Sequence, residues 1–270
     1  MVNKFLVIAA TAVTLVALVG CSASGPAENS AEPSAGTSLA DVQKAGKLVV
    51  ATEGTYRPFS FHEGGSGDIT GYDIDVITAV ADKLDLDVEF KETQFDGIFA
   101  GLEAGRFDVI ANQISINPER EAVYDFSEPY TVSPGVLIVA EDNTDITSFA
   151  TLSGHSSAQS LTSNWYKVAE DAGAVVQSVE GWAQAAELVR QGRVDATVND
   201  KLTFLDYQKT EGDTGLKIVA DTDEVSKNAL VFRKGSSDLV AAVDKALDEL
   251  RADGTLASIS KKYFGEDVSQ

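Results

Sequence analysis

Apolar and polar positions alternate through the first half of the chain in the pattern of strands separated by helices. The apolar run from Lys47 to Glu53 is bounded by polar residues, as in a strand that is buried on both faces. From Asp73 to Leu84, apolar residues recur at spacings of three and four, which predicts an amphipathic helix. The pattern then predicts a strand at 86–92, a helix at 95–104 and a strand at 107–111. This order indicates right-handed crossovers and a parallel sheet.

The second half of the chain repeats these patterns in shorter segments and has no internal sequence repeat. Strands are predicted at 135–142, 157–160, 175–179, 196–198, 216–220 and 229–234, with helical stretches at 165–172 and 183–191. These segments indicate a second, smaller α/β unit. Near the C-terminus one helical face runs from Leu239 to Leu250, Gly254 interrupts it, and a further helix begins near Leu256.

The N-terminus has the features of a secretory signal. Lys4 precedes an uncharged and mostly apolar run over residues 5–20, which is shorter than the roughly 20 residues that a membrane-spanning helix needs. The run ends in Leu18-Val-Gly-Cys21, which resembles the lipobox of bacterial lipoproteins, and Cys21 is the only cysteine of the chain. We therefore expect a signal peptide over 1–20 and a lipid on Cys21. The alternative is a transmembrane anchor with an incidental cysteine.

The segment that follows Cys21 differs in composition from the rest of the chain. Residues 22–38 are mainly Ser, Ala, Gly, Pro and Glu, so we expect a disordered tether. The body from Leu39 onward is long enough for one large domain or two lobes. Its formal net charge is strongly negative, −21 for the whole chain, which disfavours nucleic acid as a partner.

The sequence offers little support for metal or nucleophilic chemistry. It has two histidines, His62 and His155, and no zinc-type spacing of ligands. Carboxylates such as Asp73 and Asp75 are expected to be solvated helix ends. No G-x-S-x-G motif is present, and Gly64-Gly-Ser-Gly67 is expected to be a hairpin tip. We therefore expect no cofactor, no metal and no enzymatic activity.

Three predicted strands end in unusual sets of polar residues. These sets are Gly54–Tyr56, Asn112–Ser115 and Asn199–Asp200. Because ligands of open α/β sheets bind beyond the carboxyl ends of the strands, these sets are candidates for a binding site. Arg120 could offer a planar fork to a carboxylate, and Asp200 could accept from an ammonium group. Together they would suit a zwitterion. The alternative is that Arg120 makes a surface ion pair with Glu119 or Glu121.

Five blocks of the chain resemble the signatures of the extracellular solute-binding proteins of the amino-acid type, called family 3. The blocks are EGTYRPFSF from Glu53, GYDIDVITAVADKL from Gly71, FDGIFAGLEAGRFDVI from Phe95, INPEREAVYDFSEPY from Ile116 and GRVDATVND from Gly192. The resemblance covers the chain from about Leu39 to Gly265. It implies an α/β, two-lobed periplasmic-binding-protein-like fold of type II with two crossing hinge strands, near 136–140 and 229–233. Lobe 1 would hold 39–138 plus 229–270, and lobe 2 would hold 139–228.

The resemblance also implies roles for single residues. Tyr56 stands where the family places an aromatic ring over the ligand, and Phe95 stands at a pocket wall. Arg120 matches the arginine that grips the α-carboxylate, and Asp200 matches the acid that holds the α-ammonium group.

Five further residues are implied to line the site. Asn112, Gln113 and Ser115 fall at the binding strand end. Ser163 and Asn164 align with a loop that usually reads Gly-Thr-Thr or Gly-Thr-Asn, although Thr162 here replaces the glycine.

The polar set Asn112-Gln-Ile-Ser115, together with Asn199–Leu202, looks most like the cystine-binding branch of the family. The neutral amides fit a polar uncharged side chain or a second zwitterion, so L-cystine is the preferred ligand and glutamine or cysteine are alternatives. A dehydratase resembling those that act on prephenate-like acids, and a sensor domain without an importer, are the competing functions. The resemblance further implies ABC permease subunits as partners. We expect a monomer, lipid-anchored at the extracellular face of the cytoplasmic membrane, as on a Gram-positive surface.

Overall fold

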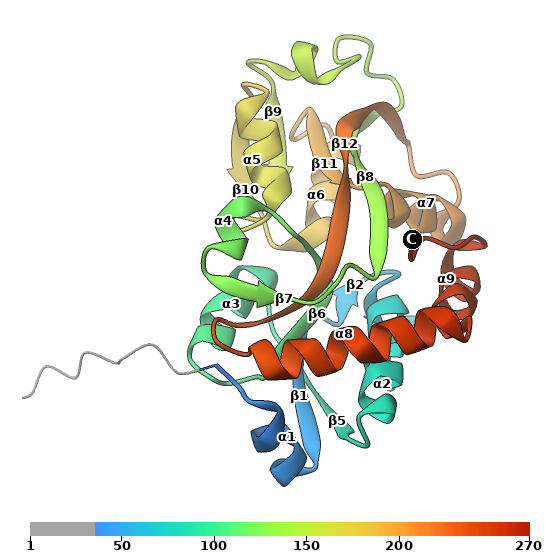
Figure 1. Cartoon of the computed structure of the whole chain (residues 1–270). Coiled ribbons are helices and arrows are strands. Elements are labelled where there is room, and N and C mark those ends of the chain that lie inside the picture. Colours follow the sequence, from blue (N-terminus) through green and yellow to red (C-terminus); the bar gives the residue numbers. More distant parts are fainter. Residues whose placement is uncertain (1–35) are drawn as a thin grey trace, which may run out of the picture. The chain divides into compact units, whose positions relative to one another are not determined.

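The computed structural model describes residues 36–270 (Figure 1). The predicted signal peptide, Cys21 and tether residues 22–35 lie outside this range. The last residues of the predicted tether are described. Thr37 is buried and its backbone N–H donates to Ser236 Oγ at 2.9 Å. Ser38 caps the first helix, α1 (Leu39–Ala45).

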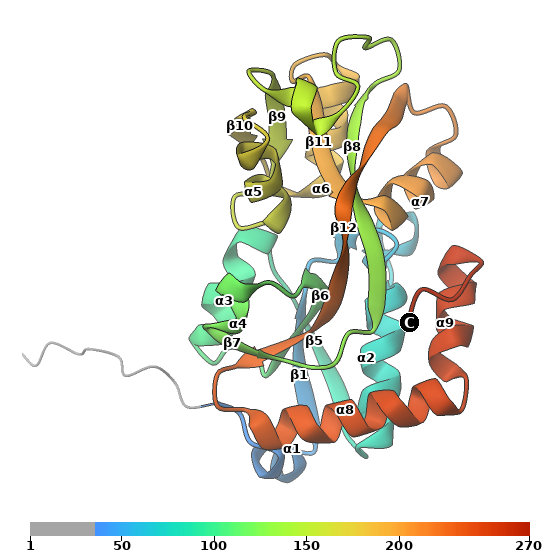
Figure 2. The same ribbon diagram turned by 45° about the horizontal axis from the view of Figure 1, so that its top comes forward.

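One mixed sheet runs through the described body. Its strands follow the order β10-β9-β11-β8-β12-β6-β1-β5, and the short β7 (Tyr124–Phe126) pairs with β12. Figures 1 and 2 show β8 and β12 passing through both parts of this sheet. We call the part with β1, β5 and β6 lobe 1, and the part with β9, β10 and β11 lobe 2. The predicted residue boundaries of the lobes remain a prediction.

Lobe 1 confirms the strand and helix order that periodicity predicts. Strands β1 (Lys47–Thr52), β5 (Asp87–Glu92) and β6 (Val109–Ser115) are parallel. Besides α1, the helices of this lobe are α2 (Tyr72–Lys83), α3 (Phe95–Glu103), the short α4 (Pro118–Glu121), α8 (Ser237–Ala252) and α9 (Thr255–Phe264). A small second sheet holds β2 (Thr55–Tyr56), β3 (Ser60–His62) and β4 (Ile69–Thr70). The glycine-rich residues 63–67 join β3 to β4, as expected for a hairpin tip.

Lobe 2 contains the shorter elements. Strands β9 (Ser156–Gln159), β10 (Val175–Ser178) and β11 (Ala196–Asp200) are parallel, and β11 runs antiparallel to β8. Its helices are the 3-10 turn Phe149–Leu152, α5 (Asn164–Asp171), α6 (Gly181–Arg190) and α7 (Lys201–Glu211). Helix α7 is absent from the sequence-based assignment. Its buried residues, Leu202, Thr203 and Phe204, are consecutive and form no stripe, while Leu205 is exposed.

The two crossing strands differ from their predicted forms. Strand β12 (Leu216–Arg233) is continuous where two strands were predicted, and β8 (Thr131–Ala140) begins before Gly135. The middle of β12 joins the lobes and is not buried on both faces, so its residues are mainly polar. Their pattern therefore does not predict a strand. The ranges 136–140 and 229–233 lie within the lobes, paired with β11 and with β6 or β7. Between them, 131–134 of β8 pairs with 225–228 of β12.

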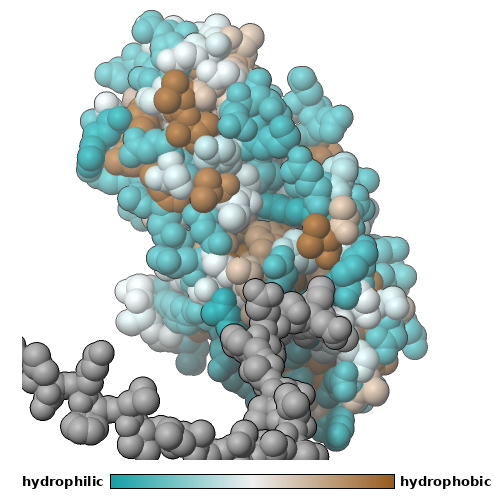
Figure 3. All heavy atoms as spheres, turned by 90° about the vertical axis from the view of Figure 1, so that its left-hand side faces the viewer, coloured by the Kyte–Doolittle hydropathy of each residue, from teal (hydrophilic) through white to brown (hydrophobic). Residues whose placement is uncertain are grey.

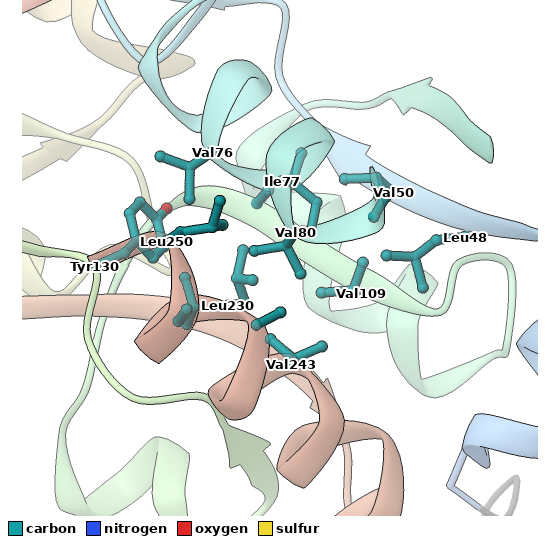
Figure 4. Close-up of a cluster of buried hydrophobic side chains, with 14 of the residues drawn as sticks. Leu48, Val50, Val76, Ile77, Val80, Val109, Tyr130, Leu230, Val243 and Leu250 are labelled. Atoms are coloured by element: carbon teal, nitrogen blue, oxygen red, sulfur yellow. The ribbon is translucent and has the colours of Figure 1, made fainter. Parts of the chain in front are cut away.

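Each lobe packs apolar side chains on both faces of its part of the sheet. In lobe 1, Leu48 and Val50 of β1 meet Ile77 and Val80 of α2 and Val243 of α8 (Figure 4). A second cluster joins the other face of this part to α3 through Ile98 and Leu102. In lobe 2, separate clusters lie under α6 and α5. Burial of this kind contributes about 25 cal/mol per Å² of apolar surface, and it fixes the strand ends that carry the polar residues.

The described surface is mainly hydrophilic on the face shown in Figure 3. Exposed apolar side chains form small separate groups among hydrophilic ones on the face shown in Figure 3. Within residues 36–270, no helix is both long and apolar enough to cross a membrane. The same part of the chain has no group of three or more His, Cys, Asp or Glu side chains placed to hold a metal ion.

Candidate functional site

The polar set after the predicted third strand lies inside β6. This strand continues to Ser115, and all seven of its residues are buried. Gln113 has a φ of 49°, a left-handed conformation that residues other than glycine seldom adopt. Its N–H donates to Asp73 Oδ2 at 2.6 Å, and its Nε2 donates to Asp200 Oδ2 at 3.3 Å. Within the described body, Gln113 Oε1 has no hydrogen-bond partner, so it can accept from a ligand.

The side chain of Asn112 forms its hydrogen bonds within lobe 1. Its Oδ1 accepts from the Glu53 N–H at 2.8 Å and from Thr52 Oγ1 at 3.1 Å. Its Nδ2 donates to Glu53 Oε2 at 2.7 Å. The side-chain amide therefore holds the Glu53 carboxylate in place, in addition to lying at the cleft between the lobes.

Ser115 connects β6 to the crossing strand β12. Its hydroxyl donates to Asn228 Oδ1 at 2.9 Å and accepts from Ser226 Oγ at 2.7 Å. Its backbone carbonyl accepts from Arg120 Nη1 at 2.9 Å. The contribution of Ser115 to the site is therefore the placement of Arg120 as well as its own side chain.

Arg120 is not a surface ion pair. It lies in α4, is 9% exposed, and its guanidinium lies over the Phe99 ring at 5.1 Å. Its Nη2 donates to the carbonyl of Thr162 in lobe 2 at 3.1 Å. Within residues 36–270, the Arg120 guanidinium donates to two backbone carbonyls and forms no salt bridge with a carboxylate, and burial lowers the pKa of Arg120 to about 10. The side chain stays cationic at neutral pH and has no anionic partner in this part of the protein.

Asp200 ends β11 and caps α7. Its Oδ1 accepts from Ser133 Oγ at 2.7 Å and from the Leu202 N–H at 2.8 Å. Burial raises the pKa of Asp200 to about 6, although these donors lower it. The carboxyl is therefore largely ionised at pH 7 and can hold a cationic group.

The aromatic and loop residues predicted for the site also lie between the lobes. The Tyr56 hydroxyl donates to Asn199 Oδ1 at 2.8 Å and accepts from Thr203 Oγ1 at 3.1 Å. Phe95 is the first residue of α3. Ser163 caps α5 by accepting from the Trp165 N–H at 3.1 Å, and Asn164 is the first residue of that helix.

Two adjoining spaces separate the lobes at this site. The smaller, about 40 Å³, is lined by Glu53, Tyr56, Phe95, Asn112, Gln113, Ser160, Ser163, Asn164, Trp165, Gly181, Trp182 and Asn199. The larger, about 700 Å³, contains Ser115 and Arg120 and shares the wall formed by Ser163, Asn164 and Trp165. The smaller space holds little more than one water, whose share of liquid volume is about 30 Å³. The side chains or the lobes must therefore move when an amino acid enters.

One carboxylate, that of Glu53, lines the smaller space, and the charges of two others, Asp96 and Glu180, act on it; sequence reasoning missed this group. Burial raises the pKa of Glu53 to about 7, and the charges of Glu180 and Asp96 raise it further, while the Asn112 hydrogen bond lowers it. Burial and Asp96 also raise the pKa of Glu180. Glu53 and Asp96 belong to lobe 1 and Glu180 to lobe 2. The available signal was the position of Glu53 at the end of the first predicted strand.

The arrangement of the lobes can be compared with solved structures. The chain superposes on an ancestral arginine-binding protein bound to arginine with a TM-score of 0.76 at 38% identity, covering 82% of this chain and 99% of that one. For the L-cystine solute receptor of Neisseria gonorrhoeae in the unliganded open conformation, the TM-score is 0.58 at 47% identity, covering 87% and 100%. The more similar sequence gives the less similar arrangement. The lobes here are closed on each other, since Tyr56, Gln113 and Arg120 of lobe 1 form hydrogen bonds to lobe 2.

Sequence comparison agrees with this likeness. The chain is 50% identical to the L-cystine-binding protein TcyA of Bacillus subtilis over 258 residues, which covers 96% of each chain. Residues 48–266 match the model of the bacterial extracellular solute-binding proteins, family 3. This match covers the paired strands, both lobes and the residues described above. The chain therefore belongs to the bacterial extracellular solute-binding proteins, family 3.

Proposed function

We propose that this protein is the substrate-binding lipoprotein of an ABC amino-acid importer and that it captures L-cystine between its closing lobes. The observation that carries the proposal is the distribution of charge in the site. Arg120 is a buried cation with no carboxylate partner in the described body, and the smaller space is lined by the carboxylate of Glu53. Such a site favours a ligand with separate anionic and cationic groups, because a charge that closure desolvates must be paired.

Each end of cystine meets a different part of this site. One α-carboxylate lies at Arg120, and the α-ammonium group on the same carbon lies at Asp200 and Gln113 Oε1. The disulfide passes under Tyr56 and beside Phe95. The ligand spans both spaces, with Ser115, Ser163 and Asn164 along its path.

The second ammonium group gives Glu53 its role. In the closed protein the charges of Glu180 and Asp96 raise the pKa of Glu53, and a cation that enters beside Glu53 relieves this repulsion. Glutamine and cysteine carry a single ammonium group, which Asp200 already holds. The acids therefore favour cystine over these two alternatives. Similarity to the cystine-binding relatives supports the same choice.

A thermal-shift panel of the twenty common amino acids and L-cystine tests the proposal. At a ligand concentration 100 times Kd we expect cystine to raise Tm by roughly 5–10 °C, since saturation adds about 2.7 kcal/mol to the free energy of unfolding. A shift with glutamine and none with cystine would assign glutamine as the ligand in place of cystine. Amino-acid capture as the function would still stand. Absence of any shift, with phenylpyruvate released from a prephenate-like acid, would favour a dehydratase instead.

Attachment to the membrane is proposed to depend on Cys21. The thiol carries diacylglycerol, and the α-amino group freed by removal of the signal peptide carries a fatty acid such as palmitate. The protein, a monomer, stays at the extracellular face of the cytoplasmic membrane beside the permease subunits. Cys21→Ser is expected to shift the protein from the membrane fraction to the medium, while Ser22→Ala leaves it in place. Retention of the Cys21→Ser protein in the membrane would favour the transmembrane-anchor alternative.

A further inference from the structure

One loop of lobe 2 is held from two sides by lobe 1. The loop precedes α5 and contains Leu161 and Thr162, both exposed. Asp96, in the first turn of α3, accepts three hydrogen bonds from it. The Oδ1 atom accepts from Thr162 N at 3.0 Å and Thr162 Oγ1 at 3.1 Å, and Oδ2 accepts from Leu161 N at 3.3 Å.

Arg120 contacts Thr162 as a hydrogen-bond donor, whereas Asp96 contacts it as an acceptor. Its Nη2 donates to the Thr162 carbonyl at 3.1 Å. Its guanidinium also lies over Phe99 of α3, the helix that carries Asp96. Both backbone groups of Thr162 and its hydroxyl are thus paired with lobe 1, the donors with a carboxylate and the acceptor with a guanidinium.

These bonds join α3 and α4 of lobe 1 to lobe 2, and they require the lobes to be closed. Asp96 lines neither of the two spaces of the site. It therefore differs from Tyr56 and Gln113, whose contacts with lobe 2 lie where the ligand enters. The Thr162 hydroxyl also adds a donor that the glycine usual at this loop position would lack.

We propose that Asp96, Arg120 and Thr162 form an interlobe clasp that slows release of the bound amino acid, with Asp96 as a positioning residue that does not touch the ligand. The inference rests on the proposed function for its ligand. Release requires the lobes to open, and opening breaks all four hydrogen bonds of the clasp. Loss of the clasp therefore acts on the dissociation rate, whereas encounter with the open protein is unaffected.

The two tryptophans of the chain, Trp165 and Trp182, both line the smaller space, so intrinsic fluorescence reports on it without a label. In stopped-flow experiments with L-cystine, Asp96→Asn is expected to raise the dissociation rate about five- to tenfold and to change the association rate less than about twofold. The matched control, Asp82→Asn, changes the same charge on an exposed part of α2 and is expected to leave both rates unchanged.

Thr162 supplies the second half of the test. Thr162→Val removes the hydroxyl donor and is expected to raise the dissociation rate about two- to fourfold, whereas Thr162→Ser retains the donor and the rate. In the double variant Asp96→Asn/Thr162→Val the dissociation rate should rise by less than the product of the two single effects, because both changes weaken the same hydrogen bond. Equal dissociation rates in Asp96→Asn and Asp82→Asn, or additive effects in the double variant, would overturn the clasp.

A readout without ligand separates failure of the clasp from failure of the cystine proposal. With 5-fluorotryptophan at positions 165 and 182, ¹⁹F NMR can distinguish closed from open protein in the absence of any amino acid. Asp96→Asn is expected to lower the closed fraction relative to wild type and Asp82→Asn. Identical spectra in the two variants contradict the clasp, whether or not cystine binds. A lower closed fraction in a protein that does not bind cystine supports the clasp and rejects only the assignment of cystine as the ligand.

Discussion

Arg120→Ala is expected to weaken L-cystine binding at least tenfold, and on the order of a hundredfold if the guanidinium meets the α-carboxylate as a two-pronged pair. Arg120 is the cation of the site that lacks a carboxylate partner in the described body, and it is 9% exposed. The loss leaves the ligand carboxylate desolvated and unpaired, which costs more than the removal of a solvated contact. Isothermal titration calorimetry measures the change directly.

The ligand itself provides the control for this variant. Cystine dimethyl ester lacks both carboxylates and keeps both ammonium groups. If Arg120 pairs with a carboxylate, Arg120→Ala should weaken binding of the ester far less than binding of cystine. A residual loss common to both ligands measures the bond from Arg120 to Thr162. Arg120→Lys keeps the charge without the fork, so an intermediate affinity is expected. Unchanged affinity of Arg120→Ala for cystine, in a protein that unfolds at the wild-type temperature, would reject the assignment.

Periodicity predicted those elements whose burial follows one regular face. Helix α2 and strands β1 and β5 lie on such faces, so their apolar spacing is visible in the sequence. Strand β12 was divided in two because its middle crosses between the lobes, where polar side chains are tolerated. Helix α7 was missed because its buried residues are consecutive. In both cases the burial pattern depends on contacts between lobes, which local periodicity does not encode.

The site was predictable as a set of residues and less so as a network. Residue types alone left Arg120 ambiguous between a surface ion pair and a carboxylate site, and its burial excludes the ion pair. The roles of the amides depend on long-range partners. Asn112 turns toward Glu53, and Gln113 turns toward Asp200 through an unusual backbone conformation held by Asp73. Such partners are far apart in sequence, so Glu53 was passed over although it ends a correctly predicted strand.

Glu53→Gln is the variant that should separate cystine from ligands with one ammonium group. The substitution preserves shape and can still accept from Asn112 Nδ2, so the local hydrogen bond survives. The lost carboxylate charge should weaken cystine binding about thirtyfold at pH 7, within the 2–5 kcal/mol range for losing one partner of a buried charge pair. Glu92→Gln, on the same lobe at the end of β5, serves as the control and should change the affinity less than about twofold.

The pH dependence has a definite sign. The pKa of Glu53 without ligand is raised to about 7, and an adjacent ammonium group lowers it, so binding releases a proton wherever the free carboxyl is protonated. Cystine affinity should therefore rise with pH between about 5.5 and 7, by up to tenfold per pH unit for one linked proton. Asp200, whose pKa is raised to about 6, contributes in the lower part of this window. In Glu53→Gln, the pH dependence of cystine affinity that comes from Asp200 should remain, and the rise in affinity nearer pH 7 should be lost.

A ligand that lacks only the second ammonium group makes the assignment specific. The mixed disulfide of cysteine and 3-mercaptopropionate keeps the disulfide and both carboxylates. If Glu53 holds the distal ammonium group, wild-type protein should bind this compound more weakly than cystine, and Glu53→Gln should cost little further affinity. An equal loss for both ligands would mean that Glu53 acts through the closed lobes and not through the ligand. In that case the three acids would set the cost of closure, and the preference for a doubly zwitterionic amino acid would need another source.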